Sequence, residues 1–286
     1  MKVEYCKECG FKHQDPLPSK KELDKYYKEK YTQESWTPKL DLKQREYLLF
    51  HAKEVYNIIN NNLHPTLPKT ILDIGCGDGH LLRVFKKEGW EIKGIEPNKK
   101  ININTDLDIF KGNLDEYINL GVKKKYSVVN ISEVLEHCRR PKEILEKVKE
   151  LMLPHGALFI EIANDFSILQ ELVDKKKREY WVCKEHINYF NLKSLTYLLD
   201  NCGFKIKYST VLFPIELGLL MGFNYLEDKE AGRDFHNMQF TMEKELEATK
   251  KGRDFKEKLY NCFKDLGIGR TILCYVELKQ EVDAQK

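Results

Sequence analysis

The chain has 286 residues, of which 42% are hydrophobic, and a formal net charge of only +3. This length allows one large α/β domain with additions or two small domains, with enough apolar residues for a core. The near-neutral charge disfavours nucleic acid as a partner, and no stretch approaches the roughly 20 apolar residues of a membrane span. The first residues lack the apolar segment of a signal peptide, and the eight cysteines are too scattered for a disulfide framework. We therefore expect a cytoplasmic protein.

The chain opens with a polar extension, residues 1–35, that is rich in cysteine and tyrosine. Cys6 and Cys9 have the spacing of one half of a zinc ribbon. Structural zinc takes four ligands, and His13 could be a third, with Cys183 or His186 as a fourth from elsewhere in the fold. The alternative, which we prefer from the sequence, is a pair of buried thiols at a tight turn.

Apolar residues at helical spacing predict a helix over 40–61, which should cross the front of a sheet. A linker rich in Asn and Pro follows at 60–68, and strand and helix signals then alternate, as is typical of a mostly parallel sheet with crossover helices. The predicted strands lie at 70–75, 91–96, 108–112, 126–132, 157–163, 204–211 and 271–278. The predicted helices of this part lie at 79–89, 141–152 and 192–202.

These elements predict a doubly wound α/β fold with a seven-stranded, mostly parallel, Rossmann-like sheet. The core should span 36–211 and be completed by a last strand and tail at 270–286. The segment 212–269 between the last two strands is charged and mostly helical, and we expect an insertion or lid over the substrate side. Its apolar start, 213–223, suits a core segment, a lid or the contact of a homo-oligomer.

A glycine-rich segment follows the first core strand and reads Asp73-Ile-Gly-Cys-Gly-Asp-Gly79. Glycine has no Cβ and accepts positive φ, so backbone N–H groups can approach a ligand closely. The third glycine comes one residue earlier than in dinucleotide folds, which disfavours an NAD-dependent oxidoreductase. Asp73 could pair with a cationic group, whereas a pyrophosphate would be repelled. The ligand that fits is an amino-acid-bearing nucleoside with a sulfonium.

Glu96 ends the second core strand, at the edge of the sheet where ligands bind in open parallel sheets. A carboxylate there can accept hydrogen bonds from both hydroxyls of a ribose. The alternative is an exposed acid at the end of a strand.

The glycine-rich segment resembles motif I of the class I S-adenosylmethionine (SAM) methyltransferases, and the likeness extends over about 67–211. It implies that Asn113 lies at the adenine edge with Leu114 on the ring, although Asn is also a common turn residue. Tyr26, Tyr27 and Tyr31 would close over the methionine end of the cofactor, unless they only pack an N-terminal arm. The cofactor-binding residues that we expect are Asp73, Gly75, Cys76, Gly77, Gly79, Glu96, Pro97, Asn113, Leu114, Ser132, Tyr27 and Tyr31.

The strand at 126–132 runs into Glu133-Val-Leu-Glu136-His137. On a helical turn this i, i+3, i+4 spacing places both carboxylates and the imidazole on one face, where they could bind a divalent cation. The motif resembles that of the ubiquinone-type O-methyltransferases and of the small-RNA 3′-terminal ribose 2′-O-methyltransferases. In both, these residues are metal ligands, and the RNA enzymes add a histidine from beyond the fifth strand, which here would be His186.

The segment around His186 also resembles the Glu-His-x-x-Tyr-Phe of sugar and natural-product methyltransferases, which need no metal. Both readings stay open: Glu133, Glu136, His137 and His186 could hold Mg²⁺ or Zn²⁺, or a histidine could act as general base. In the second case Glu133 or Glu136 would orient the imidazole. The structural alternatives are that Glu136 caps or salt-bridges the next helix and that His186 docks its loop.

The N-terminal segment resembles methyltransferases that carry a four-cysteine zinc ribbon before a Pro-x-Pro segment that ends in Leu-x-x-Tyr-Tyr. Pro16, Pro18, Leu23, Tyr26 and Tyr27 keep this later pattern, but the first cysteine pair of the ribbon is absent. The ribbon would be truncated here.

We therefore expect a SAM-dependent methyltransferase that methylates a hydroxyl oxygen of a small, hydroxyl-rich acceptor: a sugar, a polysaccharide precursor or a natural product. A catechol-like or quinone precursor is the next choice. The 3′-terminal ribose of RNA is an alternative that the near-neutral charge disfavours. A SAM-binding module without turnover is the alternative from another class.

Overall fold

The computed structural model describes residues 2–23, 42–98, 101, 106–173, 182 and 186–280. Its strands are β1 (Lys2–Tyr5), β2 (Lys12–Asp15), β3 (Thr70–Ile74), β4 (Glu91–Glu96), β5 (Ile109–Lys111), β6 (Tyr126–Ser132), β7 (Met152–Ala163), β8 (Asn188–Tyr189), β9 (Phe204–Val211) and β10 (Thr271–Leu278). Its helices are α3 (Leu42–Asn62), α4 (His80–Lys87), α5 (Leu114–Asn119), the 3₁₀ turn η1 (Leu135–His137), α6 (Pro141–Leu151), α7 (Ile168–Leu172), α9 (Leu192–Asn201), α10 (Glu216–Leu220), α11 (Lys229–Glu247) and α12 (Lys250–Asp265).

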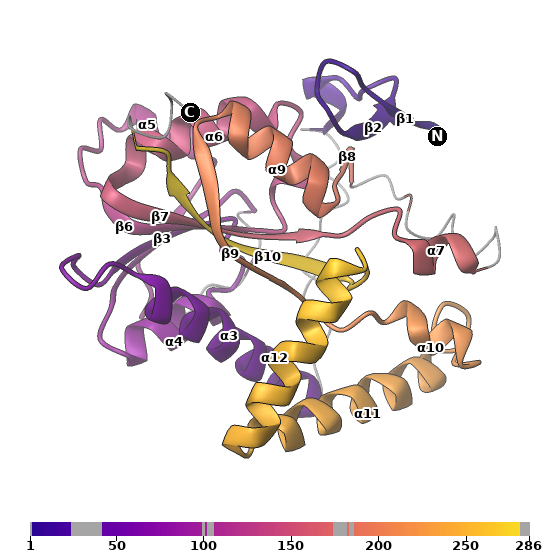
Figure 1. Ribbon diagram of the computed structural model, residues 1–286. Coiled ribbons are helices and arrows are strands. Elements are labelled where there is room, and N and C mark those ends of the chain that lie inside the picture. The colour runs from indigo at the N-terminus through magenta and orange to yellow at the C-terminus, as the bar shows by residue number, and fades with distance from the viewer. Residues whose placement is uncertain are drawn as a thin grey trace.

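The main sheet has seven strands in the order β5-β4-β3-β6-β7-β10-β9. The pairs from β5 to β7 are parallel, and β10 runs antiparallel to both β7 and β9. The strand order reverses between β3 and β6, and open α/β sheets bind ligands beyond the carboxyl ends of the strands at such a point. This arrangement confirms the predicted doubly wound, mostly parallel, Rossmann-like sheet (Figure 1).

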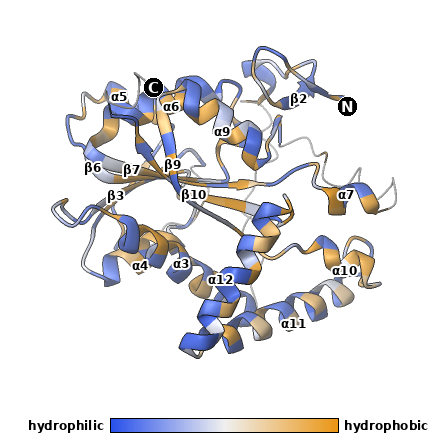
Figure 2. Ribbon diagram, viewed as in Figure 1, coloured by the Kyte–Doolittle hydropathy of each residue, from blue (hydrophilic) through white to orange (hydrophobic). Residues whose placement is uncertain are grey.

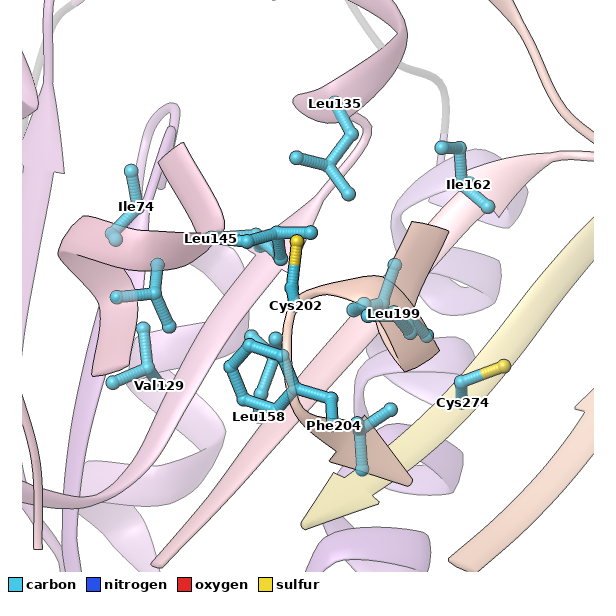
Figure 3. Close-up of a cluster of buried hydrophobic side chains, with 14 of the residues drawn as sticks. Ile74, Val129, Leu135, Leu145, Leu158, Ile162, Leu199, Cys202, Phe204 and Cys274 are labelled. Atoms are coloured by element: carbon cyan, nitrogen blue, oxygen red, sulfur yellow. The ribbon is translucent and has the colours of Figure 1, made fainter. Parts of the chain in front are cut away.

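Helices cover both faces of the sheet, with α5, α6 and α9 on one side and α3, α4 and α12 on the other (Figure 1). Neighbouring residues of a strand point to opposite faces, so that Leu72 and Val129 enter one hydrophobic cluster while Ile71 and Val128 enter the other. Figure 3 shows the first cluster, in which Leu145 of α6 and Leu199 of α9 join side chains of the strands, such as Phe204 of β9. Burial on both faces explains the near-continuous apolar runs of these strands.

Local signals fix the ends of the crossover helices. Pro141 occupies the first turn of α6, where its missing N–H costs nothing, and Asn191 forms a capping box with Ser194 at the start of α9. These signals explain why the helix boundaries could be predicted to within one or two residues. Figure 2 shows the resulting pattern: the central strands are mostly hydrophobic, and the helices carry hydrophilic residues as well.

A second, small sheet of order β1-β2-β8 joins the N-terminus to the core. Its strands β1 and β2 form an antiparallel hairpin, and β2 pairs with β8. Phe11, which is buried in the turn region of the hairpin, packs on Phe190 with 4.7 Å between the ring centroids. The sequence did not predict this sheet, because β1 and β2 read Lys-Val-Glu-Tyr and Lys-His-Gln-Asp and β8 has only two residues.

The segment between β9 and β10 folds into α10, α11 and α12. The ammonium group of Lys256, a buried residue of α12, contacts Glu54 of α3 and lies 3.0 Å from Oε1 of Glu247. These contacts fasten α12 to both α11 and α3. No helix in the described ranges has both the length and the apolarity needed to cross a bilayer.

Candidate active site

The glycine-rich loop joins the carboxyl end of β3 to α4. The N–H groups of Gly75 and Cys76 donate to the carbonyl oxygen of Ile95, at 2.8 and 3.1 Å, which anchors the loop to β4. Gly75, Gly77 and Gly79 have φ of 77°, 56° and 81°, a region that residues with a Cβ adopt at a cost. The backbone N–H groups at the start of α4 thus lie directly beyond the loop, as expected of a cofactor loop.

Asp73 is buried at the end of β3, with 3% of its surface exposed. Its Oδ1 accepts a hydrogen bond of 2.6 Å from Nδ2 of Asn130 on β6, and Oγ of Ser132 donates to Oδ1 of Asn130 at 3.1 Å. Burial raises the pKa of the Asp73 carboxyl to about 6, although the amide of Asn130 opposes this shift. The sequence analysis missed Asn130, and its signal was an amide side chain between the apolar residues Val129 and Ile131.

Glu96 is buried at the end of β4 and faces the glycine-rich loop. Its Oε2 accepts from the N–H of Gly77 at 2.9 Å, and its Oε1 accepts from the N–H of Asn98 at 2.7 Å. Burial raises the pKa of Glu96, and these two backbone donors lower it. The alternative interpretation of Glu96 as an exposed acid at the end of a strand is therefore wrong. Pro97 lies between Glu96 and Asn98, in the turn that the bond to the N–H of Asn98 closes.

The other predicted cofactor residues differ in how the structure places them. Asn113 caps α5, with its Oδ1 accepting from the N–H of Glu116 at 2.9 Å, and Leu114 is buried in the core. Cys76 is buried below the loop, where a Cβ on Gly94 would come within 2.6 Å of its Sγ. The roles of these three residues toward the cofactor stay predictions. Tyr26, Tyr27, Tyr31 and Cys183 lie outside the described residues.

Glu133 does not share a helical turn with Glu136 and His137, so this part of the expectation is wrong. The N–H of Glu133 donates to the carbonyl oxygen of Glu161 at 2.8 Å, which continues the pairing of β6 with β7. The chain then turns at Glu133 with φ of 52°, and the 3₁₀ turn η1 begins only at Leu135. The side chain of Glu133 is exposed to solvent at the carboxyl edge of the sheet.

The structure brings Glu136, His137 and His186 together, with one ligand atom of each within 4.8 Å of the others. The rings of the two histidines have centroids 4.9 Å apart and an interplanar angle of 80°. Glu136 is 1% exposed, and neither of its carboxylate oxygens has a hydrogen-bond partner among the described residues. Burial, with the charge of Glu133, raises the pKa of Glu136 well above its usual range.

An unpartnered buried carboxylate takes up a proton or binds a cation. Two imidazole rings within reach of Glu136 add nitrogen ligands, so these three residues fit a divalent ion such as Mg²⁺ or Zn²⁺. Glu133 lies outside this group of ligand atoms. The structural alternative for Glu136, a cap or salt bridge on the next helix, is wrong, since its carboxylate has no such contact in the described part of the chain.

Backbone contacts fix the segment that carries His186. The N–H of Ile187 donates to the carbonyl oxygen of Glu136 at 2.9 Å, and Nε2 of Gln14 donates to the carbonyl oxygen of His186 at 2.8 Å. Nδ2 of Asn188 donates to the carbonyl oxygen of Leu135 at 3.0 Å. The histidine is thus held by β2 on one side and by η1 on the other.

The sequence analysis also missed a buried ion pair at the same edge. Nε2 of His51 on α3 lies 2.9 and 3.1 Å from the two carboxylate oxygens of Glu161 on β7, and Glu161 is the register partner of Ser132. Burial alone would lower the pKa of His51, but the Glu161 carboxylate raises it to about 9. The same contact keeps the pKa of Glu161 below its usual range.

This pair predicts a pH-dependent stability. The pKa of His51 is higher in the folded chain than the ordinary 6.5, so its stabilisation is complete below about pH 6.5 and is lost as the pH rises through about 9. We expect His51→Gln to cost up to about 3 kcal/mol of unfolding free energy at pH 6 and much less at pH 10. Urea unfolding of the wild type and the variant at pH 6 and pH 10 measures the difference in unfolding free energy. An equal difference at both pH values would contradict the role of the ion pair.

At the N-terminus the ligand atoms of Cys6, Cys9 and His13 also lie within 4.8 Å of one another. Both cysteines are partly exposed, so the expected pair of buried thiols is wrong. His13 takes the place considered for a third ligand, whereas His186 belongs to the group with Glu136.

A depression of about 430 Å³ lies beyond the carboxyl ends of β7 and β9. Both apolar and polar side chains line its wall, among them Phe166, Leu192, Lys264 and the buried Asp165. Burial raises the pKa of Asp165 to about 7. Pockets of this size hold small organic molecules.

A family model described as a methyltransferase domain matches residues 43–209. Among curated relatives, the ubiquinone biosynthesis O-methyltransferase of Pasteurella multocida is 26% identical over 160 residues, which are 50% of this chain and 64% of the relative. That of Paraburkholderia phytofirmans is 33% identical over 104 residues, 34% of this chain and 45% of the relative. The chain thus spans less than two thirds of the length of these relatives.

Solved structures share the fold. A SAM-dependent methyltransferase from Archaeoglobus fulgidus superposes with a TM-score of 0.53 at 18% identity, over 82% of this chain and 94% of that one. The plantazolicin methyltransferase BpumL, in complex with a triazolic desmethylPZN analog and S-adenosylhomocysteine (SAH), superposes with a TM-score of 0.54 at 15% identity, over 90% of this chain and 95% of that one. With the glycine-rich loop, the buried acids and the family match, the chain belongs to the class I methyltransferases, enzymes that use SAM as methyl donor.

Proposed function

We propose that this enzyme transfers the methyl group of SAM to a hydroxyl oxygen of a small, hydroxyl-rich acceptor. The observation that carries the proposal is the group of Glu136, His137 and His186, which follows β6 beside the cofactor strand β3. Oxygen and imidazole ligands of this kind suit the deprotonation of a hydroxyl group.

The cofactor would lie across the carboxyl ends of β3 and β4. Asp73 would face the cationic amino-acid part of SAM, because a buried carboxylate is stabilised by a positive charge. Glu96 would accept hydrogen bonds from the ribose hydroxyls, and Gly75, Gly77 and Gly79 would leave room for the backbone to approach the ligand.

The reaction forms an O–CH₃ bond and breaks the S–CH₃ bond, so that SAH leaves and the hydroxyl proton must be accepted. Because the sulfonium is already a good leaving group, the protein supplies alignment and removal of that proton. A divalent cation held by Glu136, His137 and His186 would lower the pKa of an acceptor hydroxyl, and the proton would then pass to solvent. Without a cation, the imidazole of His137 or His186 would accept the proton, and reorientation of the nearby Glu136 carboxyl would let it orient that ring.

The depression beside Asp165 is the space that we assign to the acceptor. Phe166 forms part of its wall and lies 5.7 Å from the ring of Tyr189, whose own ring lies 6.5 Å from that of His186. A wall of mixed polarity suits a hydroxylated ring, such as a sugar or a phenol. The ubiquinone O-methyltransferases among the relatives make a catechol-like ring the second choice.

An acceptor screen tests this proposal. We expect SAH release with sugar or catechol acceptors, and none with the same molecules after the hydroxyl is replaced by hydrogen. Each reaction is run with and without EDTA, because activity that EDTA removes and Mg²⁺ restores shows that a cation takes part in the reaction. Turnover with amine or carbon acceptors alone would refute transfer to oxygen.

A further inference from the structure

The loop between β7 and α7 holds Phe166 in a strained backbone conformation. Its φ is 60°, in the left-handed region that a residue with a Cβ adopts at a cost. Oε1 of Gln170 accepts from the N–H groups of Phe166 and Ser167, at 2.6 and 3.3 Å. The N–H of Asp165 donates to the carbonyl oxygen of Phe190 at 2.7 Å, so the loop is fixed on both sides of the strained residue. Such strain persists where the position of a side chain serves a function.

The strained turn brings the ring of Phe166 to the wall of the depression beyond β7 and β9, where the residue is partly exposed. Nζ of Lys12 on β2 lies 3.8 Å from the centroid of this ring. The ring of Tyr189 on β8 lies 5.7 Å from it, at an interplanar angle of 67°. Lys12 and Tyr189 are register partners in the small sheet, so one residue pair of that sheet braces Phe166.

Several polar side chains of the same wall are already hydrogen-bonded within the protein. Nδ2 of Asn164 donates to the carbonyl oxygens of Gly267 and Gly269, at 3.2 and 2.9 Å. The side chains of Ser167 and Asn191 cap α7 and α9. The surface that these residues leave to a ligand is mainly apolar, and it comes from Phe166, Ile168, Leu192, Val211, Ile268 and Ile272.

We propose that the methyl acceptor stacks on Phe166, and that the acceptor therefore carries a ring with one flat apolar face. An aromatic ring and a pyranose both offer such a face, and contact with a phenyl ring removes it from water. A side chain that is already held by the backbone and by Lys12 loses little freedom on binding, which favours the contact. The assignment of the depression to the acceptor rests on the proposed function.

The contacts of Phe166 lead toward the group proposed to remove the proton. The ring of Tyr189, which braces Phe166, lies 6.5 Å from that of His186, and the ring of His186 lies 4.9 Å from that of His137. An acceptor stacked on Phe166 would therefore lie beside the segment that carries His186. Phe166 would set the orientation of the acceptor without taking part in the proton transfer.

Binding of ring-shaped probes to the enzyme saturated with SAH tests the stacking. Catechol and methyl glucopyranoside are titrated separately by calorimetry, and the probe that binds tells whether the ring is aromatic or a sugar. Phe166→Ala should weaken that binding by about tenfold or more, and Phe166→Tyr should keep it within about threefold. The affinity for SAH should not change. Binding of neither probe, or equal binding in Phe166→Ala, would overturn the proposal. Because no methyl group moves, the result does not depend on transfer to oxygen.

Glycine separates the loss of the ring from the strain. Phe166→Gly should lose the probe as Phe166→Ala does, but it should melt about 2 °C or more above Phe166→Ala because glycine accepts this φ. The matched control is His155, which also has φ of 60° and is exposed near the opposite end of β7. His155→Gly should melt above His155→Ala by a similar margin and bind the probe normally. A lower Tm for Phe166→Gly than for Phe166→Ala would show that strain does not hold the ring.

The bracing by Lys12 has its own test. Lys12→Gln removes the charge over the ring and should weaken probe binding by about threefold, whereas Lys12→Arg keeps the charge and should restore it. The affinity for SAH should be the same in all three proteins. Equal probe binding by wild type and Lys12→Gln would refute the role of Lys12 in positioning Phe166.

Discussion

Asp73→Asn should weaken the binding of SAM and SAH by about 30-fold or more, because removing one partner of a buried charge pair costs about 2 to 5 kcal/mol. Asparagine keeps the size of the side chain and can still accept from Asn130, so the change isolates the charge. Calorimetric titration with SAH measures the effect. Asp115→Asn, which removes an acid from the exposed pair with Lys147, is the matched control and should bind normally.

The same carboxyl predicts how cofactor affinity depends on pH. The pKa of Asp73 is about 6 without the cofactor, so below this pH a proton must leave before the positive charge can bind. Affinity for SAH should fall by up to about tenfold for each pH unit below 6 and should be level above about 7. A flat profile in the wild type, or the same slope in Asp73→Asn, would show that the cofactor does not pair with this residue.

His137→Ala should reduce kcat by about 100-fold to 10,000-fold, the usual contribution of a group that moves a proton. The affinity for SAH should stay within about twofold of wild type, because His137 lies beyond β6 whereas the cofactor would lie over β3 and β4. Steady-state kinetics with the best acceptor of the screen, together with SAH titration, separates the two effects.

His155→Asn is the control for that variant. His155 is exposed, lies near the opposite end of β7 and has φ of 60°, which asparagine tolerates. It should have wild-type kcat. If His137→Ala retained full kcat, or lost turnover only in proportion to its loss of SAH binding, the imidazole would have no part in proton removal.

The strands of the main sheet could be predicted because their burial is a local signal. Strands β3 and β6 are buried on both faces and read as apolar runs, interrupted only by Asp73 and by Ser127 and Asn130. Asp73 was identified by its charge and its place two residues before the first glycine. Asn130 and Glu161 have no such motif beside them, and their only signal was a polar side chain inside a buried apolar strand.

The remainder depends on contacts between distant parts of the chain. His51 and Glu161 are 110 positions apart, and no local pattern links a histidine on α3 to an acid on β7. The spacing of Glu133, Glu136 and His137 suggested one helical turn, but pairing of β6 with β7 extends through the N–H of Glu133 and delays the turn. Likewise, the hairpin at the N-terminus becomes visible only through its partner β8.

The contacts of Lys256 have a consequence for transferring the segment between β9 and β10 from one related enzyme to another. The ammonium group of Lys256 on α12 forms ion pairs with Glu54 of α3 and with Glu247 of α11. The helices of the insertion are therefore fastened to α3 by a shared set of charges. A chimera that imports only α10–α12 would leave either the lysine or its carboxylates unmatched in a buried place, which is strongly destabilising. A chimera that keeps these ion pairs must therefore transfer two segments that are separate in the sequence, Leu42–Asn62 and Glu216–Asp265.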